Sequence, residues 1–188
     1  MEKAHEIRKA AIKLFLLNGF KATSMDMIAS AVGLKKGSLY HHISSKNDLL
    51  YTEFSDAIDD VNASLKNILK SNLPPEKKLK NAIQNHVRKQ IEHFDEYRLY
   101  LQERKFLPRE FEAEYTRKRK TNETFFQKII GEGNVQGSFR RDLDVRMTTF
   151  CLFGMLNWMT QWYKPGGRLS HEEISQHIYD VTMHGIGA

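Results

Sequence analysis

At 188 residues, the chain is long enough for one domain or for a small domain joined to a larger one, each with its own hydrophobic core. Its single cysteine, Cys151, excludes an internal disulfide, and its place in an apolar run predicts a small buried side chain rather than a reactive thiolate. Of the net charge of +6, five positive charges lie in residues 1–47, where eight Lys and Arg face three acidic residues, so the basic character belongs to one small module.

No segment of the chain is suited to cross a membrane. The first twenty residues alternate charged and apolar side chains, unlike the continuous apolar core of a signal peptide. The longest apolar stretch, residues 150–158, is interrupted by Asn157 and is too short for a span. A soluble protein of the reducing cytoplasm is therefore expected.

Two helices are predicted at the start of the chain. Residues 4–17 form the first, because apolar side chains recur at three- and four-residue intervals, and Gly19 follows as its C-terminal stop. Thr23 is the predicted N-cap of a short second helix, with Asp26 three residues later in an imperfect capping box. Gly33 supplies the left-handed turn residue that ends this helix.

A third short helix is predicted at residues 35–42, with Leu39 on its inner face. The turn before it contains Ala29, Gly33 and Leu34 in the pattern Ala-x-x-x-Gly-Leu. The small alanine lets two helices approach closely, the glycine makes the bend, and the leucine fills the junction. This arrangement predicts a helix-turn-helix.

Six more helices are predicted, at residues 47–70, 76–93, 96–106, 109–133, 145–163 and 171–184. Their predicted starting signals are Ser45, Pro75, Pro108, Asp142 or Asp144, and Ser170 with Glu173 in a full capping box. The long charged helix from residue 109 is expected to stop in the glycine-rich stretch GEGNVQG. The fold class is therefore all-α with about nine helices: a helix-turn-helix domain at residues 1–47, followed by a helical bundle at residues 48–188.

Metal and catalytic sites are not predicted. His41 and His42 are neighbours on a helix and point about 100° apart, so they cannot hold one ion from a regular helix. No cysteine or well-spaced carboxylate completes a zinc site, and no catalytic motif or phosphate-binding glycine loop is present. We expect no catalytic residues, no cofactor and no metal, and an enzyme that uses the C-terminal bundle is a less favoured hypothesis.

The stretch LKKGSLYHHISSK, residues 34–46, has the side chains of a DNA-binding surface. Lys36 and Lys46 can neutralise phosphates at the two ends of the helix, and Gly37 lets the backbone approach DNA. Groups able to bond to phosphates or base edges follow on Ser38, Tyr40, His41 and His42. The alternative is that Tyr40 is packed in the core and the lysines only solvate the helix.

These residues resemble a known family. The segment AAIKLFLLNGFKATSMDMIASAVGLKKGSLYHHISSKNDLL, residues 10–50, is similar to the DNA-binding domain of TetR-family transcriptional regulators. The resemblance implies operator contacts, mostly to phosphates, by Thr23, Lys36, Gly37, Ser38, Tyr40, His41, His42 and Lys46. Lys35 stands where the family usually has a small hydroxyl residue that caps the recognition helix. Lysine cannot supply that cap, but it can add a phosphate contact.

The resemblance also implies an all-α homodimer that binds double-stranded operator DNA through two reading heads, with the last two helices as the dimer interface. A ligand in the C-terminal bundle would change the spacing of the heads and release a near-palindromic operator. Repression relieved by a ligand is thus the expected function. A nonspecific nucleic-acid-binding protein is the alternative, although it gives the large apolar bundle no purpose.

The resemblance implies that residues 48–188 bind a ligand and dimerise. Residues 147–163 are apolar nearly all round, so they must be covered on several sides, as a helix between a pocket and a dimer partner would be, and the expected effector is a small hydrophobic molecule. Bulky candidates for its pocket are Phe94, Tyr97, Tyr100, Leu101, Phe125, Phe126, Phe150, Met155, Trp158, Met159 and Trp162. The segment LFGMLNWMTQWYKPGGRLSHEEI resembles the C-terminal helices of family members linked to fatty-acid or steroid catabolism, which suggests an acyl-CoA thioester. Arg119 and its basic neighbours in residues 117–120 would then meet the phosphates of coenzyme A. The favoured interpretation of these basic residues is a solvated helix face balanced by nearby glutamates. An aromatic-lipophile-responsive efflux repressor is the alternative regulator.

Overall fold

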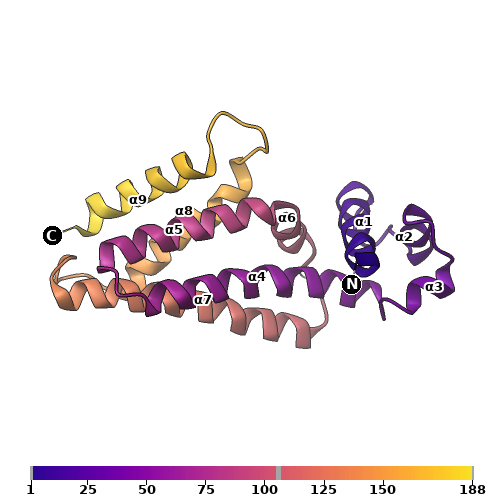
Figure 1. Cartoon of the computed structure of the whole chain (residues 1–188), viewed down its shortest axis with the longest axis horizontal. Helices are drawn as coiled ribbons and strands as arrows, with labels where there is room; N and C mark the ends of the chain where they lie inside the picture. The colour runs from indigo at the N-terminus through magenta and orange to yellow at the C-terminus, as the bar shows by residue number, and fades with distance from the viewer. Residues whose placement is uncertain (1, 105–106, 188) are drawn as a thin grey trace. The chain divides into compact units, whose positions relative to one another are not determined.

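The chain is all-helical in the part that the computed structural model describes, residues 2–104 and 107–187 (Figure 1). The helices are α1 (Glu2–Asn18), α2 (Met25–Ala31), α3 (Lys36–Tyr40), α4 (Lys46–Lys70), α5 (Pro75–Glu92), α6 (Phe94–Glu103), α7 (Arg109–Gln136), α8 (Val145–Trp162) and α9 (His171–Ile186). These nine helices confirm the predicted fold class. The helix predicted at residues 96–106 is observed as α6, and the predicted end at Phe106 lies outside the described residues.

The helices belong to two compact units. Residues 1–57 and 94–115 make up the first unit, and residues 58–93 and 116–188 make up the second. Helices α4 and α7 each supply residues to both units. The predicted boundary after residue 47 divides the chain by function, into residues expected to bind DNA and residues expected to bind a ligand, and it remains a prediction.

In the first unit, α1 packs against α2 and α6, and α2 packs against α3. The core between the first three helices contains Ile7, Phe15, Ile28 and Leu39, all of them fully or almost fully buried. The turn after α2 follows the prediction, because Gly33 has a φ of 67° and the Leu34 amide donates to the Ala29 carbonyl at 2.9 Å. Leu39 thereby fixes which face of α3 is turned inward.

The start of α2 corrects the sequence prediction by one residue. The N-cap is Ser24, whose hydroxyl accepts a hydrogen bond from the Met27 amide at 3.2 Å. Thr23 is buried, and its hydroxyl donates to the Gly19 carbonyl at 2.9 Å, with the Leu14 carbonyl at 3.1 Å as a second acceptor. Thr23 therefore ties α2 to the end of α1, and the more exposed serine caps the helix.

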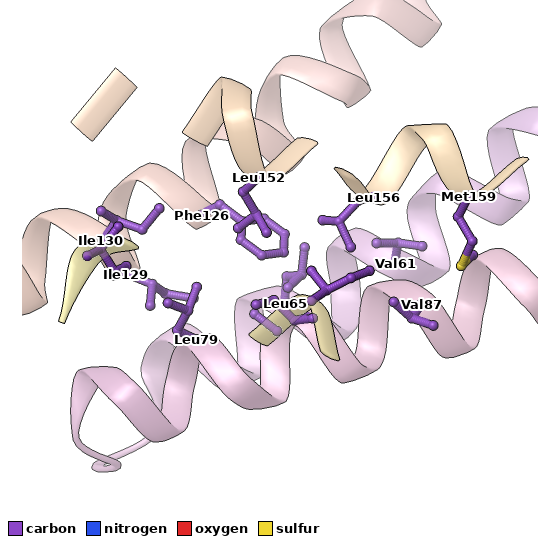
Figure 2. Close-up of a cluster of buried hydrophobic side chains, with 14 of the residues drawn as sticks. Val61, Leu65, Leu79, Val87, Phe126, Ile129, Ile130, Leu152, Leu156 and Met159 are labelled. Atoms are coloured by element: carbon purple, nitrogen blue, oxygen red, sulfur yellow. The ribbon is translucent and has the colours of Figure 1, made fainter. Parts of the chain in front are cut away.

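The second unit is built around one hydrophobic cluster, shown in Figure 2. Four helices supply its labelled side chains: Val61 and Leu65 from α4, Leu79 and Val87 from α5, Phe126, Ile129 and Ile130 from α7, and Leu152, Leu156 and Met159 from α8. Helix α9 packs along α5 and against α8, and it adds Ile174 and Ile178 to the cluster. At one end, the buried ammonium of Lys78 donates to both carboxylate oxygens of Glu132 at 2.9 Å, which joins α5 to α7.

Helix α7 runs further than predicted. It continues through both glycines of residues 131–133 and ends at Gln136, before Gly137 with a φ of 79°. The ring of Phe139 lies where a Cβ of Gly133 would be, and the Phe139 amide donates to the Gly133 carbonyl at 3.1 Å. Gly133 is therefore present because the fully buried Phe139 packs on it, and the helix ends one turn later.

Most predicted helix starts are confirmed. The hydroxyl of Ser45 accepts from the Asp48 amide at 3.0 Å, and Asp144, one of the two predicted candidates, accepts from the Met147 amide at 3.0 Å. Ser170 and Glu173 form the complete capping box. None of the helices in the described ranges is long and apolar enough to span a bilayer.

The prediction for Cys151 is wrong. Its side chain is exposed on α8, although the surrounding sequence is apolar. The reason is that one face of α8 is not covered within the chain. Four large apolar side chains of that helix, Met147, Phe150, Trp158 and Trp162, are exposed as well.

Candidate nucleic-acid interface and effector region

Helix α3 presents nearly all of its side chains to solvent. It has five residues, and only Leu39 is buried. Of the predicted DNA-binding residues, those with exposed side chains or backbone are Lys35, Lys36, Gly37, Ser38, Tyr40, His41 and His42. Tyr40 is 48 % exposed, which contradicts the alternative that it packs in the core. The local fold thus gathers these seven residues on one small basic, hydroxyl-rich surface.

Lys35 is the N-cap residue of α3, and its side chain makes no capping hydrogen bond. This confirms the expectation that a lysine here cannot cap. Its backbone is extended, with φ −76° and ψ 149°, as an N-cap requires. The exposed ammonium of Lys35 is therefore next to the first turn of α3, where it adds charge to the surface instead of closing the helix.

Lys36 is paired with an acid of the preceding helix. Its Nζ lies 2.7 Å from a carboxylate oxygen of Asp26, and both side chains are more than half exposed. The hydrogen bond and the charge of Asp26 raise the pKa of the lysine, so it stays cationic. In water such an exposed pair contributes little to stability, and Lys36 can exchange Asp26 for a phosphate.

Lys46 has an internal role. Its Nζ donates to the carbonyl oxygens of Phe20 at 2.6 Å and Thr23 at 2.9 Å, and it lies 4.4 Å from the centre of the Phe20 ring. Partial burial lowers the pKa of this lysine. Lys46 therefore holds the start of α4 against residues 20–23. Nine residues were predicted to bind DNA, and seven of them are exposed. The other two, Lys46 and the buried Thr23, are engaged in contacts within the protein.

The predicted effector residues are divided between the two units. Phe94, Tyr97, Tyr100 and Leu101 belong to α6 in the first unit. Tyr100 is buried in an aromatic stack, with ring centres 4.1 Å from Tyr115 and 5.2 Å from Phe54. Leu101 is exposed and Phe94 is buried. These side chains do not form one continuous lining on α6.

The other bulky candidates belong to the second unit and have three kinds of environment. Phe126 and Met159 are fully buried in the hydrophobic cluster. Phe125 and Met155 pack against it in part, and Phe150, Trp158 and Trp162 are exposed on α8. Met155 also lines a groove of about 390 Å³ between α8 and α9, whose other walls include Met147, Cys151, Val181 and Gly185.

The basic residues 117–120 are partly engaged in ion pairs. Lys118 lies 2.5 Å from the carboxylate of Asp59, and Arg119 lies 3.8 Å from that of Glu123. Arg117 and Lys120 are exposed. For Lys118 and Arg119 this geometry favours the alternative of a charged helix face balanced by acidic neighbours.

Three ligating groups of the second unit come within 4.8 Å of one another, those of Asp60, Glu92 and His93. Lys89 lies among them, with Nζ 2.6 Å from Asp60 and 2.9 Å from Glu92. The hydrogen bonds from Lys89 lower the pKa of both carboxyls. The lysine serves as their counter-ion, so this cluster is an ion-pair network.

The second unit also contains a buried polar group that the sequence did not predict. His86 and Gln90 on α5 and Asn122 on α7 are almost completely inaccessible, and each has a side-chain N or O atom without a hydrogen-bond partner among the described residues. The only sequence signal is that they occupy core-facing positions of otherwise amphipathic helices. The sequence shows only that His86 and His93 are about two helical turns apart, which is too far for them to bind one metal ion together.

Comparison with known families gives two matches that together cover most of the chain. Residues 7–51 match the family model described as bacterial regulatory proteins, tetR family. Residues 72–186 match the model described as tetracyclin repressor-like, C-terminal domain. The first match contains the whole of α2 and α3, and the second contains α5 to α9.

Similar proteins are transcriptional regulators. The HTH-type transcriptional repressor KstR2 of Mycolicibacterium smegmatis is 32 % identical over 185 residues, which cover 96 % of this chain and 89 % of that protein. The crystal structure of the TetR-family regulator PfmR from Thermus thermophilus is 31 % identical, with a TM-score of 0.88 over 95 % of this chain and 97 % of PfmR. AibR, solved in complex with isovaleryl coenzyme A and operator DNA, is 26 % identical, with a TM-score of 0.80 over 95 % of this chain and 97 % of AibR. The prediction that the chain is not an enzyme is confirmed by these relatives.

Proposed function

Because this chain belongs to the TetR family of bacterial transcriptional regulators, we propose that it is a repressor that leaves a near-palindromic operator when it binds a small hydrophobic effector. The observation that carries this proposal is the exposed surface of α3, where two lysines, two histidines, Ser38 and Tyr40 lie outward around the buried Leu39. This surface has the size and charge to enter a major groove. A protein that binds operator DNA in this way acts in the cytoplasm.

In this proposal the seven exposed residues of the α3 surface contact DNA directly. Thr23 and Lys46 support them by fixing residues 20–23 to α1 and α4. Two copies of the chain bind one operator, since a single short recognition helix reads too few base pairs for specificity. The DNA-binding function is assigned to residues 1–47, and ligand binding and dimerisation to residues 48–188.

An acyl-CoA thioester is the leading candidate for the effector. The support is that AibR, similar over nearly its whole length, was solved with isovaleryl coenzyme A and operator DNA. An acyl chain also suits the apolar side chains of α7 and α8. A role in fatty-acid metabolism would follow. The alternative is an aromatic lipophile, with a role in efflux.

DNA binding is tested first by footprinting the region upstream of the protein's own gene and measuring affinity by fluorescence anisotropy. We expect protection of a short inverted repeat. Tyr40→Ala should weaken binding about tenfold with an unchanged melting temperature, because the side chain is exposed. Lys46→Ala should lower both the affinity and the melting temperature, because the hydrogen bonds to the Phe20 and Thr23 carbonyls are lost. Equal affinity for operator and random DNA at moderate salt would refute the repressor and support a nonspecific nucleic-acid-binding protein.

The effector is tested by native mass spectrometry of the purified protein with a small panel of acyl-CoA thioesters. A bound thioester that also releases the operator would support the leading candidate. Retention of the operator with every thioester in the panel would favour the aromatic lipophiles.

A further inference from the structure

Three of the buried polar side chains in the second unit, those of His86, Gln90 and Asn122, have polar atoms without the partners that such groups require. Both ring nitrogens of His86, both amide atoms of Gln90 and the Oδ1 of Asn122 have no hydrogen-bond partner among the described residues. Gln90 is wholly inaccessible, and the other two are at least 97 % buried. Buried polar atoms in native proteins are nearly always paired, and each unpaired one costs about 1–3 kcal/mol.

The three side chains lie at neighbouring levels of two antiparallel helices. Lys78 of α5 is bonded to Glu132 of α7, and two turns further along α5 the His86 ring lies 6.0 Å from the ring of Phe126. Moving toward the C-terminus of α5 therefore corresponds to moving toward the N-terminus of α7. One more turn on each helix brings Gln90 and Asn122 to the same level.

Two aromatic rings pack against the His86 ring. The His86 ring packs edge-on against Phe126 and against Phe153 of α8, with ring centres 6.0 and 5.6 Å apart. Phe126 and Phe153 also pack on each other at 5.2 Å. Figure 2 shows Phe126 among the aliphatic side chains of the cluster, near Leu152. The ring nitrogens of His86 are therefore set in an apolar environment, where a hydrogen bond is strong and specific.

The orientation of Asn122 is fixed by a chain of hydrogen bonds. Asn62 on α4 donates to the Lys118 carbonyl at 3.1 Å and, through its own Oδ1, accepts from the Nδ2 of Asn122 at 3.1 Å. The amide nitrogen of Asn122 is thereby engaged, and its oxygen is the atom left over. Asn122 presents an acceptor, so the partner that completes this group must donate a hydrogen bond.

We propose that His86, Gln90 and Asn122 form the polar subsite for a hydroxyl group carried by an apolar effector. A hydroxyl can donate to Asn122 Oδ1 and at the same time accept from the amide of Gln90 or the imidazole of His86. A ketone only accepts, so it leaves the Asn122 oxygen unpaired. The inference rests on the proposed function, because it names the chemistry of the effector for that regulator.

The subsite excludes a carboxylate for electrostatic reasons. Burial lowers the pKa of His86 to about 4, so the imidazole is neutral at physiological pH and offers no positive charge. A buried carboxylate without a counter-ion is strongly disfavoured. An uncharged hydroxyl does not carry this penalty.

The test uses full-length protein and two matched pairs of probes, 2-octanol with 2-octanone and menthol with menthone. Dissociation constants are measured by titration, with the imidazole signals of ¹⁵N-histidine-labelled protein as a local readout. We expect each alcohol to bind about tenfold more tightly than its ketone, the effect of about one hydrogen bond in a buried site, and to shift the His86 signals. Failure of both alcohols to bind, or equal binding of alcohol and ketone, would overturn the proposal.

Variants separate a ligand subsite from a structural role. Gln90→Leu and Asn122→Leu should abolish the preference for the alcohol. In the probe-free protein Gln90→Leu should keep or raise the melting temperature, because an unpaired buried polar group is removed, whereas Asn122→Leu also removes the hydrogen bond to Asn62 and should lower it slightly. Gln84→Leu, the same kind of change at a half-buried position of α5, should leave the preference intact. A large loss of stability with an unchanged preference would show that the polar groups serve the fold alone.

The operator affinity of the wild-type protein, measured without probe, distinguishes a failure of the subsite proposal from a failure of the repressor proposal. A wild-type protein that recognises its operator but has no preference for the alcohol would refute the subsite and leave the repressor standing. A wild-type protein that prefers the alcohol but does not recognise an operator would refute the repressor and leave the subsite.

Discussion

Glu53 of α4 shows how a single partly buried carboxyl can make the first unit sensitive to pH. Its carboxylate lies 2.8 Å from Nε of Arg8 on α1. Burial raises the pKa of Glu53 to about 7, with smaller contributions from the charges of Glu96 and Asp56, and Arg8 opposes the rise. The folded protein therefore holds a proton that the unfolded chain, with a pKa near 4.5, gives up.

The sign of the effect follows from this difference. A carboxyl whose pKa is raised on folding contributes stability that is complete below about pH 4.5 and is lost as the pH rises through about 7. Relative to Glu53→Gln, the free energy of unfolding of the wild-type protein should fall by roughly 1 kcal/mol between about pH 5 and about pH 8. This figure is smaller than the full pKa shift would give, because water reaches part of the carboxyl. Urea unfolding of both proteins across this range measures it, and parallel stability curves would contradict the prediction.

Thr23 and Ser24 illustrate what sequence leaves open at the residue scale. Both are hydroxyl residues with good N-cap propensity, so the pattern before α2 suits either. The threonine is drawn inside by its contacts with the Leu14 and Gly19 carbonyls, and the serine is left to cap. Such a choice depends on which side chain the neighbouring helix buries, and local spacing does not contain that information.

At the scale of elements, α3, the proposed recognition helix, has no side-chain cap. Lys35→Thr would place a hydroxyl where it can accept from the first free amides of α3, which typically adds about 1 kcal/mol. The melting temperature should rise by about 2–4 °C. Operator affinity should fall a few-fold and the salt slope should become shallower by about one, because one phosphate-neutralising charge is lost.

The measurement for this variant is thermal unfolding together with anisotropy titrations at several salt concentrations. The sequence preference should stay the same, since Lys35 is expected to act on phosphates and not on bases. A changed base preference, or an unchanged salt slope, would show that Lys35 has another role.

The helices themselves were largely predictable, and their ends less so. Each of the nine predicted helices is present in the part of the chain that the structure describes, because each amphipathic face must be buried. Helix α7 passed its predicted stop because Gly133 is required by the Phe139 ring, a residue that packs back onto the helix from beyond its end. A glycine read in isolation indicates a helix stop, whereas here it indicates a close contact.

At the scale of the whole molecule, the apolar face of α8 and α9 is the feature that a second copy of the chain would cover. Phe150, Trp158 and Trp162 of α8 and Val181 of α9 are exposed, with Trp158 at 65 %. A contiguous apolar face of this kind is typical of a protein–protein interface. Trp158→Glu should therefore convert the dimer to monomers and weaken operator binding by at least tenfold.

Analytical ultracentrifugation measures the oligomeric state of the variant, and anisotropy titrations measure its affinity for the operator. Val135→Glu introduces the same charge at an exposed apolar position at the end of α7, and it should leave the dimer and the operator affinity unchanged. A Trp158→Glu protein that remains dimeric would place the interface on another surface.

The sequence by itself determined the helical fold class, the helix-turn-helix and the surface predicted to bind DNA, because each depends on residues close together in the chain. Periodicity decides a helix, and Gly33 followed by Leu34 decides the turn. Tertiary structure alone decided that Lys46 and Thr23 are engaged internally, that Cys151 is exposed, and that His86, Gln90 and Asn122 are buried in the second unit with polar atoms that have no hydrogen-bond partner among the described residues. These outcomes depend on which helix faces are covered by elements far away in sequence, and no local pattern specifies that.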